Sequence, residues 1–101
     1  MPQLRIDPAL ASDFAALTAD AGVREALAHV ERDAEATLAE QKTLATIPAP
    51  TFAESERAAY LAARFAELGF ADLRLDAAGN VIACRPGSGE GPTLVISAHL
   101  D

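Results

Sequence analysis

The spacing of apolar residues changes along the chain, and the change separates helical regions from strand-forming ones. Residues 23–46 carry apolar side chains at intervals of three to four, which predicts one long helix with a narrow stripe. A second helix is predicted from a capping-box pattern, Thr51 answered by Glu54, to about Leu68. Gly69 then supplies a left-handed stop, and Phe70 beyond it is expected to make the closing apolar contact.

A shorter helix is predicted before these two. Asp7 followed by Pro8 is a helix-start signal, and Gly22 is expected to end the helix or separate it from the next. Its apolar face consists of Leu10, Phe14 and Leu17. We therefore divide the chain into an amino-terminal arm or short helix, residues 1–22, and a main portion, residues 23–101.

Beyond the second helix the period becomes two. Residues 72–76 alternate polar and apolar side chains, residues 77–80 form a turn, and residues 81–84 form a second strand, so a β-hairpin is predicted. A polar, glycine-rich loop follows. Residues 93–99 are a short apolar run typical of a strand that is buried on both faces of an α/β sheet.

Charge and composition exclude some partners. Of 101 residues, 50% are apolar, and the formal net charge is −7. Nucleic acids and anionic membranes bind basic surfaces, so neither is expected as a partner. Cys84 is the single cysteine, which excludes an internal disulfide, and the first residues lack a signal-peptide pattern. We expect a cytoplasmic protein.

The apolar run ends at a possible metal ligand. Side chains two apart on an extended chain point the same way, so His99 and Asp101 would face one cleft if the chain is extended there. A carboxylate that accepts the proton of one ring nitrogen fixes the tautomer and leaves the other nitrogen for a metal. The alternative is a histidine that caps a strand end beside an ordinary surface aspartate.

Four stretches in this order resemble the amino-terminal part of the dinuclear zinc peptidases and deacylases, which include peptidase T, carboxypeptidase G, acetylornithine deacetylase and the aminoacylases. They are the proline-containing junction, the second helix, the hairpin and the apolar run with His99 and Asp101, at residues 46–51, 54–70, 76–83 and 94–101. The resemblance implies an α/β fold in which helices are followed by a β-hairpin and an inner strand. These would be part of a three-layer αβα catalytic domain.

The resemblance also implies a function. His99 matches the histidine that binds one of two zinc ions, and Asp101 matches the catalytic-site acid that orients this imidazole without binding metal. The family hydrolyses short peptides or N-acyl amino acids, and the junction at residues 46–51 leans toward the peptidase T-like branch. The bridging aspartate, the general-base glutamate and the remaining ligands would lie beyond Asp101, so we expect an amino-terminal fragment that is inactive alone.

Two further expectations follow. An inner strand without its neighbours leaves an open apolar edge, so we expect either self-association of the chain at this edge or a homodimer of the full-length form. The alternative function is a non-catalytic interaction module that binds a partner through the exposed strand or the long helix. A different group of zinc aminopeptidases that shares the strand and the His-x-Asp pair also stays open.

Overall fold

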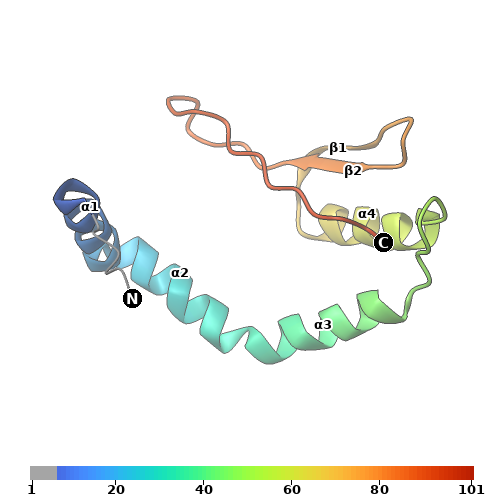
Figure 1. Cartoon of the computed structure of the whole chain (residues 1–101), viewed down its shortest axis with the longest axis horizontal. Coiled ribbons are helices and arrows are strands. Elements are labelled where there is room, and N and C mark those ends of the chain that lie inside the picture. The colour runs from blue at the N-terminus through green and yellow to red at the C-terminus, as the bar shows by residue number, and fades with distance from the viewer. Residues whose placement is uncertain (1–6) are drawn as a thin grey trace, which may run out of the picture. The chain divides into compact units, whose positions relative to one another are not determined.

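The protein is represented by a computed structural model that describes residues 7–101 and forms two compact units. The first unit extends to Glu40 and the second is Gln41–Asp101. The described part contains four helices and a two-stranded antiparallel sheet (Figure 1), which confirms a mixed α/β fold. The division into an arm and a main portion stays a prediction, and residues 1–6 of that arm lie outside the described residues.

The first helix, α1 (Pro8–Ala19), begins where the sequence predicts. Asp7 Oδ1 accepts a hydrogen bond of 2.9 Å from the backbone N–H of Ala9, and proline occupies the first helical position. These two features satisfy or remove backbone donors that the first turn leaves without helical partners. The apolar face is nevertheless exposed: Leu10, Phe14 and Leu17.

The boundary between the first two helices lies at Asp20, so the predicted role of Gly22 is wrong. Asp20 ends α1 and its Oδ1 accepts a 3.0 Å hydrogen bond from the backbone N–H of Val23, which starts α2 (Ala21–Arg32). Gly22 therefore lies inside the first turn of α2. An aspartate at the N-cap outweighs the helix-ending tendency of a glycine two residues later.

The predicted long helix over residues 23–46 is two helices, α2 and α3 (Ala34–Thr46), because the chain leaves regular helix at Asp33. Aspartate is a weak helix former that favours the positions at helix ends, and the Asp33 carboxylate accepts a 2.9 Å hydrogen bond from the hydroxyl of Thr37 in the first turn of α3. Much of the predicted stripe is exposed, including Leu27, Val30 and Leu38. No helix within residues 7–101 combines the length and apolar character needed to cross a membrane.

The helix α4 (Ser55–Glu67) begins later than the predicted capping box at Thr51. Residues 51 and 52 form a turn instead, in which Phe52 has a φ of 67°. Glu54 does reach back, but its Oε1 accepts the backbone N–H of Phe52 at 2.7 Å. The Thr51 hydroxyl is consequently available for a contact that is distant in sequence.

The end of α4 agrees with the prediction. Gly69 has a φ of 75°. Its backbone N–H donates to the carbonyl oxygen of Ala66 at 3.0 Å, and the backbone N–H of Phe70 donates to the carbonyl oxygen of Phe65 at 3.0 Å. This pair of bonds is the Schellman motif, in which a residue with positive φ lets the last carbonyls find donors. The rings of Phe65 and Phe70 lie 5.1 Å apart between centroids, so the expected closing contact is present.

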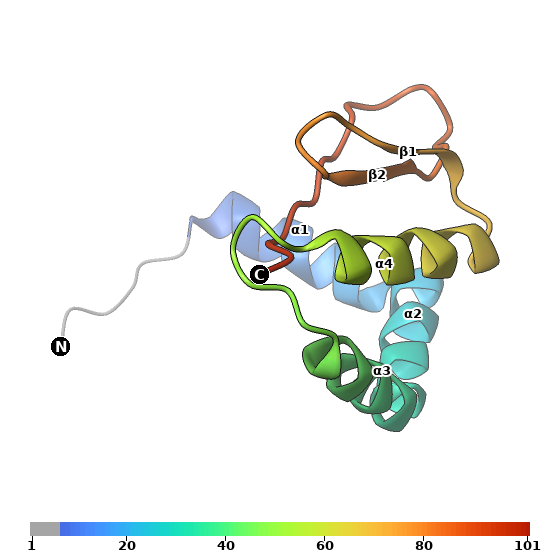
Figure 2. The ribbon, with the colours of Figure 1, turned by 90° about the vertical axis from the view of Figure 1, so that its right-hand side faces the viewer.

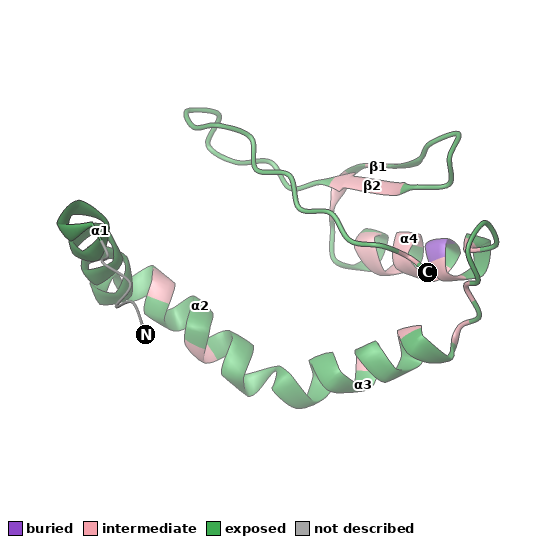
Figure 3. Cartoon of the chain, viewed as in Figure 1, coloured by how far each residue is buried: buried purple, intermediate pink, exposed green. Residues whose placement is uncertain are grey.

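The predicted hairpin is also confirmed. Strands β1 (Ala71–Leu75) and β2 (Val81–Cys84) pair antiparallel, with Leu75 opposite Val81 and an irregularity before Arg74. Both strands contact α4, and Figure 2 shows the hairpin lying along this helix. Many of the residues of intermediate exposure belong to α4 and the two strands (Figure 3), and Ala58 of α4 is the one residue of the described part that is buried.

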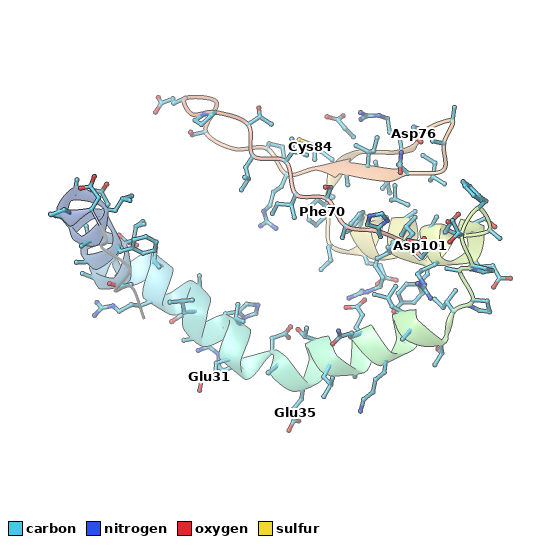
Figure 4. All side chains as sticks on the ribbon, viewed as in Figure 1. Glu31, Glu35, Phe70, Asp76, Cys84 and Asp101 are labelled. Carbon is cyan, nitrogen blue, oxygen red and sulfur yellow. The ribbon has the colours of Figure 1, made fainter. Side chains whose placement is uncertain are left out.

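Asp76 closes the turn of the hairpin (Figure 4). Its Oδ2 accepts from the Asn80 side-chain amide at 2.8 Å, and its Oδ1 accepts from the backbone N–H groups of Asn80 at 3.0 Å and Ala78 at 2.9 Å. These bonds, that of the Asn80 amide foremost, hold the pKa of Asp76 below its ordinary value. The turn is therefore fixed by side-chain chemistry within five residues.

The predicted inner strand is absent: residues 93–99 form neither strand nor helix. Leu94, Val95 and Ile96 are 82%, 80% and 87% exposed, so the expected burial is also wrong for this chain. An apolar run becomes a strand only when a neighbouring strand pairs with its backbone N–H and C=O groups, and the hairpin does not extend to this segment.

Candidate functional site

The candidate site lies at the carboxyl end of the described chain. His99 Nδ1 lies 3.2 Å from Asp101 Oδ1, so the structure brings together the two residues that the sequence predicts. The His99 side chain is 92% exposed, whereas that of Asp101 is 34% exposed. Because the carboxylate faces Nδ1, the other ring nitrogen, Nε2, is the one left for a cation.

Asp101 makes a second contact, with the loop before α4. Thr51 Oγ1 donates a hydrogen bond of 3.1 Å to Asp101 Oδ2, across 50 positions of sequence. The two oxygens of one carboxylate are therefore engaged by different groups, His99 and Thr51. Such a carboxylate has less freedom to rotate than one held at a single oxygen.

The backbone between the two site residues is held by Arg57, which lies in the first turn of α4. Its Nη1 donates to the carbonyl oxygen of Leu100, and its Nη2 donates to the carbonyl oxygen of Ile47 at 2.6 Å. Leu100 is half-buried, while residues 91–99 are all exposed. Figure 4 shows the carboxyl end, labelled at Asp101, beside α4. One guanidinium thus joins the junction, the helix and the candidate site.

The donor set of this region fits one metal ligand and no more. Residues 7–101 contain no group of three or more histidine, cysteine, aspartate or glutamate side chains arranged to hold a metal ion. A catalytic zinc ion is usually held by three protein ligands. His99 with its carboxylate partner has the chemistry of one such ligand, and a catalytic centre would need others from outside these residues.

Sequence reasoning missed Thr51 and Arg57. The local pattern at Thr51 predicts a helix cap, whereas its partner, Asp101, lies 50 positions away, too far along the chain for a local pattern to indicate. Arg57 lies in an ordinary amphipathic helix, where an arginine is most simply a solvated residue. The single signal available was the proline-containing junction before α4, because a stiff connection can bring distant segments into a fixed arrangement.

Comparison with known proteins adds no relative: no protein-family model, no curated protein and no solved structure matches this chain. The relationship to the dinuclear zinc peptidases and deacylases therefore stays a prediction, which depends on the four sequence stretches and on the His99–Asp101 pair.

Proposed function

We propose that this chain is the amino-terminal part of a zinc-dependent hydrolase that cleaves short peptides or N-acyl amino acids, with a lean toward peptidase T-like exopeptidases. The observation that carries the proposal is the 3.2 Å approach of Asp101 Oδ1 to His99 Nδ1, with the imidazole exposed. His99 would bind one zinc ion through Nε2, and Asp101 would hold the imidazole in the required tautomer.

The metal would supply the chemistry common to such enzymes. When bound, two zinc ions polarise the scissile carbonyl and lower the pKa of a water molecule. This chain's own residues would contribute one neutral imidazole and the carboxylate that orients it. The proposal places the other ligands and the general base in further polypeptide, within which residues 93–99 would be an inner strand of a three-layer αβα domain. It also includes a cytoplasmic location.

The experiment compares two histidine variants in the longest polypeptide that the gene encodes. His99→Ala is expected to lower the bound zinc, measured by elemental analysis, and to abolish hydrolysis of a panel of tripeptides and N-acetyl amino acids. His29→Ala is the matched control, because His29 is the chain's other histidine and is exposed on α2. Retention of full zinc content and activity by His99→Ala would refute the proposal.

A second candidate function is a non-catalytic interaction module. It is favoured by the exposure of Leu94, Val95 and Ile96, each at least four-fifths accessible, because contiguous exposed apolar residues commonly mark interaction surfaces. The two functions differ in what the wild-type polypeptide does: the module would show no zinc-dependent hydrolysis for His99→Ala to abolish, and its partner binding would depend on the apolar residues of 94–96.

A further inference from the structure

We propose that Thr51 and Arg57 are positioning residues that set the orientation of the His99 imidazole, Thr51 through the Asp101 carboxylate and Arg57 through the backbone of Leu100. The inference rests on the proposed function only for what the imidazole binds. The orientation itself follows from contacts among residues 47–57 and 99–101, all within the second compact unit.

The role of Thr51 follows from the division of the Asp101 carboxylate. A carboxylate bound only by His99 could turn about its terminal bond and offer either oxygen. With Thr51 Oγ1 donating to Oδ2 at 3.1 Å, Oδ1 is the oxygen that faces His99 Nδ1 at 3.2 Å. A carboxylate oxygen can only accept, so the carboxylate favours the tautomer that carries its proton on Nδ1. The hydroxyl supports this tautomer by holding the carboxylate in the orientation that keeps an acceptor in front of Nδ1.

The role of Arg57 follows from its two carbonyl partners. Hydrogen bonds from a charged group are stronger than neutral ones, and the planar guanidinium directs its donors at fixed angles. The bond to Leu100 fixes the peptide unit between His99 and Asp101, and the bond to Ile47 ties it to the junction before α4. Arg57 Nε is buried and has no hydrogen-bond partner among the described residues, so the two terminal nitrogens anchor the group.

These contacts matter because the preceding segment has no regular structure to place the site. Residues 85–99 are exposed and form neither strand nor helix. Without Thr51 and Arg57, His99 and Asp101 would follow a segment that has no regular structure, and their mutual orientation would depend on the two side chains alone. The 43 positions between Arg57 and Leu100 make this a tertiary constraint, not a local turn.

The test uses the isotope-labelled 101-residue chain without metal, at a pH at which imidazole is neutral. The ring-nitrogen chemical shifts of His99 report the ratio of the two tautomers. Thr51→Val keeps the shape but removes the hydroxyl, and is expected to lower the ratio of the Nδ1–H to the Nε2–H form by roughly fivefold. Thr51→Ser keeps the hydroxyl and is expected to restore the original ratio, which a purely structural role of Thr51 would not require.

Backbone relaxation tests Arg57 in the same sample. Arg57→Gln is expected to lower the amide order parameters of Leu100 and Asp101 to below about 0.6, the range of flexible segments. Arg64→Gln is the matched control, since Arg64 lies on the same helix and pairs with Glu67, and it should leave those values unchanged. Circular dichroism verifies that α4 persists in each variant.

Two results would overturn the inference: an unchanged tautomer ratio in Thr51→Val together with unchanged order parameters in Arg57→Gln, or a Thr51→Ser variant that behaves like Thr51→Val. Neither readout involves metal. A failure of His99 to bind zinc would therefore refute the proposed function while these measurements still decide the positioning roles.

Discussion

Two regions of the second unit differ in how far their contacts reach along the sequence. The end of α4 and the hairpin, residues 64–84, are closed by hydrogen bonds between residues within about one helical turn, or by one short antiparallel ladder. Residues 85–101 have no ladder, and the contacts that fix their end run to Thr51 and Arg57, 50 and 43 positions away. Local chemistry therefore completes the first region, whereas the second region depends on distant partners.

The largest expected effect comes from removing the aromatic contact that closes α4. Phe70→Ala deletes a half-buried ring that lies 5.1 Å from the ring of Phe65, and should lower the free energy of unfolding by about 2 kcal/mol. Urea denaturation followed by circular dichroism measures this. Phe14→Ala on α1 is the control: its side chain is 64% exposed, so a change within about 0.5 kcal/mol is expected. Equal losses in both variants would contradict the closing role of Phe70.

A smaller effect is expected at the left-handed residue of the same motif. Gly69→Ala places a Cβ at a φ of 75°, which should cost about 1 kcal/mol and speed hydrogen exchange of the Phe70 amide roughly fivefold. Gly87→Ala is the control, because Gly87 lies in open space and has no left-handed φ. If the Phe70 amide exchanges at the same rate in both variants, the left-handed conformation of Gly69 does not stabilise the end of α4.

The hairpin turn should weaken in acid. The pKa of Asp76 is held below the ordinary aspartate value of about 3.9. Its ionised form therefore stabilises the folded turn above that value, and the contribution is lost as the pH falls through the lower folded-state pKa. Hydrogen exchange at the Asn80 amide, corrected for its intrinsic pH dependence, should show protection declining below about pH 4. Asp76→Asn should remove this decline in protection, whereas the control Asp13→Asn on α1 should leave the decline unchanged. A decline that persists in Asp76→Asn would exclude Asp76 as its cause.

The sequence predicts the locally closed elements better than the contacts between distant segments. The sequence predicts the start of α1 at Asp7, the stop at Gly69 and the turn after Asp76, because each depends on groups that lie only a few residues apart. The break at Asp33 was missed because an unbroken apolar stripe outweighed one local capping residue. The start of α4 was misplaced because Thr51 has a partner, Asp101, that no window of helical length contains.

The candidate site was predicted in part for the same reason. His99 and Asp101 are two residues apart, so their approach follows from spacing once the chain is extended. Thr51 contacts Asp101, and Arg57 contacts the intervening Leu100, only after the chain has folded back to α4, and no periodicity encodes these contacts. The prediction of an inner strand at residues 93–99 is wrong for this chain. Apolar character shows that a segment favours burial, but it does not show that the chain offers another strand to pair with that segment.

Ile96→Lys is expected to have the smallest effect on stability. It also distinguishes the two regions most clearly. Ile96 is 87% exposed and belongs to no regular element, so its replacement should change the free energy of unfolding by less than about 0.5 kcal/mol. Self-association should change instead. Residues 93–97 have unpaired backbone groups and apolar side chains, which together can pair with a second copy of the chain, and a charge there opposes such pairing.

Size-exclusion chromatography with light scattering measures the mass of wild type and variant over a range of concentrations. We expect concentration-dependent association in the wild type and a monomer in Ile96→Lys. Leu27→Lys on α2 is the control, because Leu27 is an exposed apolar residue outside the segment. A monomeric wild type would show that this apolar run does not join copies of the chain. Association lost equally in both variants would instead indicate general hydrophobic clustering, in which the 93–97 segment has no special part.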